Sequence, residues 1–224
     1  FNLHFTTNFA PQIPVGGHLH PVAGYSPMSQ SDTKTLAYTV LTDAQKHRFE
    51  ENLELDFSFG IKGLARFRAN NFFQRGAVGA VYRTIPVEIK SFNQLALPAV
   101  VAQISEKPRG LVLVTGPTGS GKSTTLAAMI DKINMDRHDH ILTIEDPIEF
   151  VHQHKNCLVN QREVHQDTAS FSNALRAALR EDPDVVLVGE MRDLETIESA
   201  LRIAETVHLT SGTLHTNSAA QTIN

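Results

Sequence analysis

Hydrophobic and polar positions form short runs over the first part of the chain, and Pro and Gly separate these runs. Such runs are typical of short strands, and the strands they predict are Asn2–Thr6, Gln12–Val15, His18–Val22, Asp56–Phe59, Ala65–Phe73 and Gly79–Ile85. A longer stretch, Thr35–Leu53, has apolar residues roughly at helical spacing and predicts one helix. Because small Gly-containing turns join the last three strands, we expect a small α+β domain with an antiparallel sheet.

After about residue 109 the pattern changes to continuous apolar runs that alternate with helical segments. The strands predicted here are Leu111–Thr115, His140–Ile144, Cys157–Val164, Val185–Val188 and Leu209–Leu214. The helices predicted here run from Gly121 to about Ile133, over Phe171–Leu179 with one apolar face, and from Leu194 to Ala204 with Asp193 as cap. Alternating buried strands and helices predict an α/β fold with a largely parallel sheet covered on both faces, in which 157–164 lies near an edge.

We place the domain boundary between these two patterns. The expected organisation is a first domain over 1–90, a linker over 91–108 with a short helix at Pro98–Ser105, and an α/β domain over 109–224. The chain begins with Phe1 and stops at Asn224 within a predicted helix. We therefore expect it to be part of a longer protein.

Composition narrows the classes of protein. The chain has 224 residues, of which 41% are hydrophobic and 20% charged, as in soluble globular proteins. Its formal net charge is −4 and it has no Trp. The chain therefore lacks both an overall positive charge that would attract nucleic acid and Trp side chains on which bases could stack. The apolar runs are far too short for a bilayer, so we expect no transmembrane segment and a cytoplasmic location.

A phosphate-binding loop lies between the strand at 111–115 and the helix that follows. The loop reads Gly116-Pro117-Thr118-Gly119-Ser120-Gly121-Lys122-Ser123, which fits GxxxxGK[ST] in its strand-to-helix context. Glycines let backbone N–H groups turn toward phosphate, the lysine reaches the β- and γ-phosphates, and the serine hydroxyl is a ligand for Mg²⁺. The residues predicted to bind ATP are Gly116, Pro117, Thr118, Gly119, Ser120, Gly121, Lys122, Ser123 and Thr124.

Carboxylates follow two of the apolar strands. Glu145 and Glu149 follow the strand at 140–144, and Glu190 follows the strand at 185–188. Because ligands of open α/β sheets bind at the carboxyl ends of strands, we predict that Glu190, with Ser123, lies near Mg²⁺, and that Glu145 or Glu149 polarises the attacking water. Solvated charges or helix caps are the alternative, and Asp146 has the alternative role of holding the turn before Pro147.

His215 ends the last predicted strand, in Gly212-Thr213-Leu214-His215-Thr216. An imidazole at this position can hydrogen-bond a γ-phosphate and report its loss. A structural role is the alternative for this side chain. The remaining histidines are interpreted as surface or packing residues, not as metal ligands.

Several segments resemble one family. The loop from Val112 through Met129, the acidic segment Ile144–Val151, the segment Arg180–Thr196 and the segment His208–His215 resemble the phosphate loop, aspartate box, atypical Walker B motif and histidine box of secretion-superfamily ATPases. Asn160-Gln161-Arg162-Glu163-Val164 is similar to the type IV pilus retraction branch of that family. The chain departs from the family pattern at Val207, which is usually glycine, and at the polar pair Thr210-Ser211.

This resemblance implies a PAS-like first domain, a RecA-like P-loop second domain and a homohexameric ring that hydrolyses Mg-ATP. It also implies pilus machinery and an inner-membrane platform protein as partners, with a peripheral position at that membrane. In such a ring, arginines of one subunit or domain can reach the γ-phosphate of another. Arg176 and Arg180 share a helix face, and Arg66, Arg68 and Arg83 belong to the first domain. The resemblance favours Arg83, Arg176 and Arg180 for this role, and ordinary surface ion pairs are the alternative.

Three other functions remain as alternatives. A pilus-assembly or type II secretion ATPase belongs to the same class. A nucleotide-regulated ring component with little turnover would keep the lysine and lose the carboxylates. A nucleic-acid motor is disfavoured by the negative charge.

Overall fold

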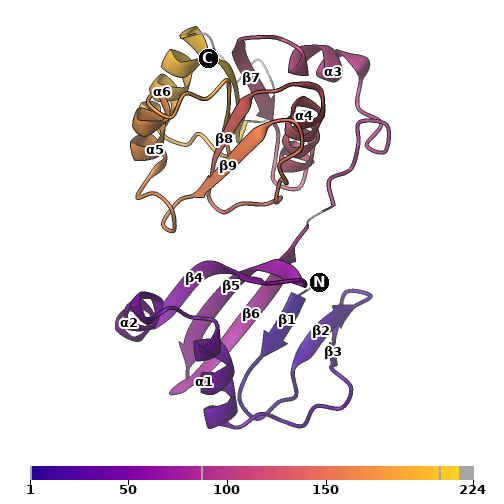
Figure 1. The fold of residues 1–224 in the computed structure, drawn as a ribbon. Helices are drawn as coiled ribbons and strands as arrows, with labels where there is room; N and C mark the ends of the chain where they lie inside the picture. The colour runs from indigo at the N-terminus through magenta and orange to yellow at the C-terminus, as the bar shows by residue number, and fades with distance from the viewer. Residues whose placement is uncertain (1, 87, 207, 217–224) are drawn as a thin grey trace. The chain divides into compact units, whose positions relative to one another are not determined.

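The computed structural model describes residues 2–86, 88–206 and 208–216 (Figure 1). Val207 and the helix predicted around Asn224 lie outside the described residues. The chain folds as two compact units, one ending at Ile85 and the other beginning at Pro86.

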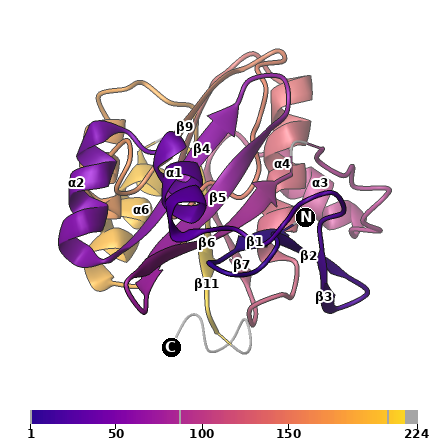
Figure 2. The ribbon, with the colours of Figure 1, turned by 90° about the horizontal axis from the view of Figure 1, so that it is seen from below.

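The first unit is a six-stranded antiparallel sheet with two helices. The strands lie in the order β3-β2-β1-β6-β5-β4. They are β1 (Asn2–Phe5), β2 (Gln12–Val15), β3 (His18–Pro21), β4 (Glu54–Ile61), β5 (Ala65–Gln74) and β6 (Ala77–Ile85). Figures 1 and 2 show the β2–β3 hairpin at the end of this sheet away from α1 (Gln30–Thr39) and α2 (Asp43–Asn52). The predicted α+β domain with an antiparallel sheet is confirmed.

The prediction of a single helix over 35–53 was wrong, because two helices occupy this region. A second helix begins after Thr42, whose side chain accepts from the Gln45 N–H while the Gln45 side chain accepts from the Thr42 N–H. This reciprocal pair satisfies backbone donors that a continuous helix would not expose, so it starts a new helix. The first helix starts in the same way at Ser29, several residues before the predicted start.

The second unit is a five-stranded parallel sheet in the order β7-β11-β10-β8-β9. Its strands are β7 (Gly110–Thr115), β8 (His140–Glu145), β9 (Leu158–Glu163), β10 (Val185–Val188) and β11 (Leu209–Leu214). Its helices are α3 (Ala99–Ser105), α4 (Lys122–Asp136), α5 (Phe171–Ala178) and α6 (Leu194–Glu205). The predicted α/β fold and the edge position of 157–164 are confirmed.

Helices cover both faces of this sheet (Figure 1). On one face α5 and α6 pack on strand residues such as Leu142, Ile144 and Val186. On the other face α4 packs on residues such as Ile141 and Val185, and the short helix α3 of the predicted linker joins the same cluster. These two apolar layers hold the carboxyl ends of the strands in one row, which is where the predicted site residues lie.

The predicted apolar face of α5 needs one correction. Ala174, Leu175 and Ala178 are buried as expected, but Leu179 is the C-cap residue and 51% of it is exposed. The helix ends one residue too early to carry Leu179 toward the sheet. Among the described residues, no helix combines the length and the apolar character needed to cross a bilayer.

The interior strand β11 carries an unusual buried hydroxyl. Thr210 is 0% exposed, and its Oγ1 has no hydrogen-bond partner among the described residues. A buried hydroxyl without a partner costs about 1–3 kcal/mol. We therefore expect Thr210→Val, which keeps the shape and removes the hydroxyl, to raise the free energy of unfolding by about 1 kcal/mol in urea titrations.

Thr213, on the same strand, is the matched control. Its Oγ1 donates to the Gly189 carbonyl at 2.6 Å, so Thr213→Val leaves that carbonyl without this donor and should lower the free energy of unfolding. Equal losses of stability in both variants would contradict the interpretation of Thr210.

Candidate active site

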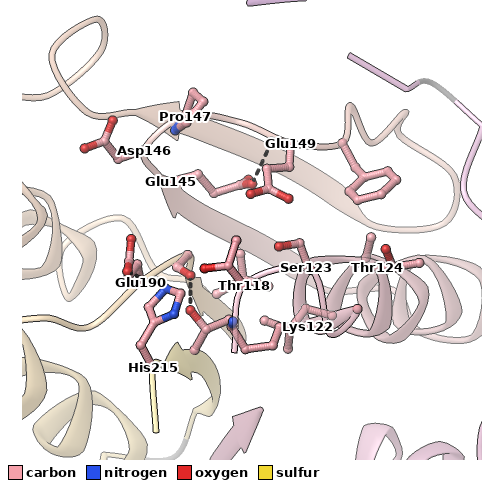
Figure 3. A pocket seen from close by; sticks show the side chains of 18 of the residues that line it. Thr118, Lys122, Ser123, Thr124, Glu145, Asp146, Pro147, Glu149, Glu190 and His215 are labelled. Carbon is pink, nitrogen blue, oxygen red and sulfur yellow. Dashed lines mark hydrogen bonds and ion pairs between the residues drawn. The ribbon is translucent and has the colours of Figure 1, made fainter. Parts of the chain in front are cut away.

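One pocket of about 380 Å³ lies at the carboxyl edge of the parallel sheet (Figure 3). Most of the predicted site residues line it, namely Thr118, Gly119, Gly121, Lys122, Ser123, Thr124, Glu145, Glu149, Glu190 and His215. They come from the loop after β7, the start of α4 and the ends of β8, β10 and β11. Strands that run parallel bring these segments together, because their carboxyl ends meet at one edge.

The loop after β7 leaves the first backbone N–H groups of α4 without a side-chain cap. Gly121 is the N-cap of α4 with φ 94, a left-handed conformation that favours glycine. Side-chain oxygens cap α1, α2, α5 and α6, whereas no side chain of the described residues caps α4. Its first N–H groups and the positive end of the helix dipole are therefore available to an anion.

Lys122 folds back over this loop. Its Nζ donates to the Gly116 carbonyl at 2.8 Å and to the Pro117 carbonyl at 3.1 Å, and the residue is 9% exposed. Gly116 and Pro117 thus contact the lysine but do not line the pocket, and Ser120 does not line it either. The ammonium group is held at the phosphate-binding loop by two neutral acceptors that a phosphate oxygen can replace.

Glu145 is the last residue of β8 and is buried. Its carboxylate accepts from Thr143 Oγ1 at 2.6 Å, from Gln161 Nε2 at 3.2 Å and from the Glu149 N–H at 3.4 Å. Burial raises the pKa of Glu145, and these three hydrogen bonds oppose the rise. Glu149 is exposed at the pocket (Figure 3). The two candidates for the base therefore differ in environment. Glu145 is desolvated and fixed by hydrogen bonds, whereas Glu149 is solvated.

Gly189 allows β8 and β10 to approach each other at this edge. A Cβ on Gly189 would lie 3.1 Å from the Glu145 Cα and 3.2 Å from the Ile144 carbonyl oxygen. Both neighbours are backbone atoms, which cannot move away without shifting β8. A glycine at this position therefore brings Glu190 and Glu145 to the same pocket.

Glu190 and His215 form a pair at the ends of two adjacent strands (Figure 3). His215 Nε2 lies 2.7 Å from Glu190 Oε1, and Arg192 Nε lies 2.7 Å from the same oxygen. The Glu190 side chain is only 16% exposed. Either side chain of this pair can hydrogen-bond a ligand in the pocket.

The predicted arginines do not line this pocket. Arg83 belongs to the first unit, where the register places it directly opposite Arg68, and its Nε donates to Asn2 Oδ1 at 3.3 Å. Like charges directly opposite one another on a sheet are unfavourable. Arg176 pairs with Glu195 at 3.2 Å on the exposed surface of α5 and α6, and Arg180 follows α5. Their predicted action on phosphate needs a second domain or subunit.

Sequence reasoning missed several residues of the site, namely Thr143, Phe150, His152, Gln161 and Thr213. Thr143 could have been found, since a residue two places before Glu145 on one strand lies on the same face. No sequence pattern indicated His152 as a site residue. Its burial lowers its pKa to about 4, so it is neutral at pH 7. Gln161 belongs to another strand, and only the register brings it to Glu145.

Comparison with known proteins gives the family. Residues 84–224 match the family described as type II/IV secretion system protein. The chain belongs to this family.

Relatives within the type II/IV secretion family extend over nearly the whole chain. It is 57% identical over 222 residues, 99% of its length, to the "Type IV pilus retractation ATPase PilT" of Pseudomonas aeruginosa. It is 55% identical over 213 residues, 95% of its length, to the "Twitching motility protein" of Neisseria gonorrhoeae. The chain spans 64% and 57% of the lengths of these two relatives.

A solved structure agrees with the fold. The crystal structure of the pilus retraction motor PilT with bound ADP superposes with a TM-score of 0.96 at 54% identity. The alignment covers 99% of this chain and 65% of that one. At this identity the similarity extends beyond fold, so the type II/IV secretion family is supported by sequence and structure alike.

Proposed function

We propose that this protein is a subunit of a homohexameric motor that hydrolyses Mg-ATP and drives type IV pilus retraction. The observation that carries the proposal is one pocket in which an uncapped helix start, Lys122 and three glutamates converge. The proposal is supported by the similarity to a retraction ATPase and a twitching motility protein over almost the whole chain. A retraction motor with bound ADP is similar to it in structure.

Mg-ATP fits the donor groups of the pocket. The open N–H groups of α4 and the Lys122 ammonium suit phosphate oxygens, which are anionic. The Ser123 hydroxyl and the Glu190 carboxylate offer the hard oxygen atoms that Mg²⁺ prefers, and both line the pocket. When bound, Mg²⁺ would supply positive charge against the triphosphate.

The protein's own side chains would have separate roles in ATP hydrolysis. Lys122 leaves its loop carbonyls and binds the β- and γ-phosphates of ATP. Glu145 or Glu149 orients the attacking water and accepts its proton. The Glu145 pKa, raised by burial, moves toward the operating pH and makes this residue the better base of the two. His215, in contact with Glu190, hydrogen-bonds the γ-phosphate and loses that bond on hydrolysis.

The hexamer supplies what one chain lacks. The pocket is lined by no arginine, and Arg83, Arg176 and Arg180 lie on other surfaces of the described residues. In a ring, one or more of them reaches the γ-phosphate bound by a neighbour, so that hydrolysis is linked to movement between domains. We further propose a cytoplasmic location, at the inner membrane, with a pilus platform protein as the docking partner.

The same site would serve a pilus-assembly or type II secretion ATPase, since that chemistry is identical. The similarity to a retraction ATPase over 99% of the chain favours retraction. A ring component with little turnover is disfavoured, because Glu145, Glu149 and Glu190 all line the pocket.

Glu190→Gln tests the proposed activity. The amide keeps the size of the side chain and removes the charge, so we expect ATP to bind with little change while phosphate release falls by about 10²–10⁴-fold. Nucleotide titration and steady-state phosphate release measure the two effects separately. In a strain that lacks the full-length gene, the full-length protein with this substitution should not restore pilus retraction.

Glu198→Gln is the matched control, since Glu198 is an exposed glutamate of α6 outside the pocket. It should hydrolyse ATP and support retraction as the unchanged protein does. Normal turnover in Glu190→Gln would contradict the proposed role of Glu190 beside Mg²⁺ and leave the chemical step to Glu145 or Glu149 alone.

A further inference from the structure

The side chain of Gln161 connects three parts of the candidate active site. Its Nε2 donates to Glu145 Oε1 at 3.2 Å and to the Phe150 carbonyl at 2.8 Å. Its Oε1 accepts from the His152 N–H at 2.8 Å. One amide thus contacts a carboxylate of the pocket and the backbone at two points of the segment that follows β8.

The fold places Gln161 where these contacts are possible. It lies on the edge strand β9, directly opposite Thr143 of β8, in a parallel pair. Thr143 and Glu145 lie on the same face of β8, and Thr143 donates to the carboxylate oxygen that also accepts from Gln161. Two neutral donors from adjacent strands therefore converge on one oxygen of Glu145.

The same edge strand holds the segment at a further point. Glu163 Oε2 accepts from the Ile148 N–H at 3.2 Å, and the Val164 N–H donates to the Glu145 carbonyl at 2.8 Å. Residues 146–152, which carry Glu149, are thus tied to β9 in their middle and at their end, and the residue before them is tied to the residue that follows β9. Of these contacts, only those of the Gln161 side chain hold the end of the segment.

We propose that Gln161 is a positioning residue for ATP hydrolysis, which fixes the Glu145 carboxylate and the backbone that carries Glu149 in one arrangement. This inference rests on the proposed function. Gln161 does not line the pocket and acts through residues that do. Gln161 belongs to the segment Asn160–Val164, whose sequence resembles that of the pilus retraction branch. The contacts described above give this resemblance a physical reason.

The charge on Glu145 gives the inference a measurable consequence. Burial raises the pKa of Glu145, and the hydrogen bond from Gln161 is one of the contacts that lower it. A hydrogen bond to the charged form favours that form, so loss of the donor raises the pKa further. If Glu145 must be ionised to act, the loss of activity on acidification will begin at higher pH without Gln161.

Two substitutions separate the contacts. Gln161→Leu removes the two donated bonds and the accepted one at nearly constant size. Gln161→Glu keeps an acceptor for the His152 N–H but replaces the donor with a second negative charge beside Glu145. Asn160→Ala is the matched control, because Asn160 is the exposed neighbour on β9 and its amide contacts His140.

We expect kcat for phosphate release to fall by about 10–100-fold in both Gln161 variants, since small displacements of reacting groups have effects of this order. The KM for ATP should stay close to that of the unchanged chain, and the acid limb of the pH–rate profile should move to higher pH. Amide hydrogen exchange at His152 should speed up in Gln161→Leu and stay slow in Gln161→Glu. Asn160→Ala should change none of these quantities.

Each outcome decides one question. Folded Gln161 variants with unchanged kcat and an unchanged pH profile would overturn the inference, as would unchanged exchange at His152 in Gln161→Leu. These measurements use the full-length protein. Absence of phosphate release from the unchanged full-length protein would contradict the proposed function and leave the exchange result to decide the positioning role. Circular dichroism establishes that each variant is folded, and Gln161→Glu decides the kinetic question if Gln161→Leu does not fold.

Discussion

Lys122→Ala should abolish phosphate release from Mg-ATP. In the structure the Lys122 ammonium is held by the Gly116 and Pro117 carbonyls, at the open start of α4. A β- or γ-phosphate oxygen is a stronger acceptor than these neutral carbonyls, so the ammonium would transfer to ATP. Its removal takes away a preorganised charge where negative charge develops, and single losses of this kind cost about 10²–10³-fold in rate. Loss of the lysine from ATP binding adds to this effect.

The measurement is steady-state phosphate release at saturating Mg-ATP, with nucleotide affinity measured in parallel. Lys132→Ala is the matched control, because Lys132 lies on the same helix and pairs with Glu106 and Asp136 away from the pocket. It should retain activity. Full activity in Lys122→Ala would refute the assignment of the phosphate-binding loop.

A mixture of two inactive variants, Lys122→Ala and Arg176→Ala, should recover part of the ATPase activity. If Arg176 acts on the γ-phosphate of a neighbouring subunit, mixed rings contain some interfaces with an intact loop and an intact arginine. Arginines that act in this way contribute about 10³–10⁵-fold in rate, so each variant alone should be close to inactive. The recovered activity is measured at high protein concentration against the same variants kept apart.

The surroundings of Arg176 are consistent with a trans role. It pairs with Glu195 at 3.2 Å, and the two side chains are 63% and 60% exposed. Exposed pairs of this kind are weak, so the guanidinium can leave Glu195 at little cost when a phosphate approaches. Glu195 also lines a second pocket that contains Asp146 and Glu190, next to the candidate active site.

Arg202→Ala is the control for the mixing experiment, since Arg202 is an exposed arginine of α6 outside the predicted set. Alone, it should be active. Mixed rings must be verified by mass measurement. Verified mixed hexamers that stay inactive would exclude a trans role for Arg176, and the same test would then be applied to Arg83.

The sequence by itself determined the chemistry of the loop and the sheet edge. The order of residues from Gly116 to Ser123 specifies a turn that only glycines can make, with a lysine and a hydroxyl after it. Parallel strands align their carboxyl ends, so residues that follow Ile144 and Val188 must lie near the loop. Both features follow from short stretches of sequence, namely the loop itself and the residue that comes directly after each strand. For this reason Lys122, Glu145, Glu190 and His215 could be predicted to come together.

Only the tertiary structure decided how these groups are held. The contact of Gln161 with Glu145 depends on which residue of β9 faces Thr143, and a shift by one residue would turn the side chain to the other face. The contact between His215 and Glu190 and the burial that raises the Glu145 pKa also arise between segments far apart in sequence. Apolar periodicity does not encode register, and desolvation depends on everything packed around a group. The sequence therefore identified pocket-lining residues that follow a strand or a loop directly, such as Lys122 and Glu190, but it missed Gln161, whose hydrogen bonds arise from the packing of strand on strand.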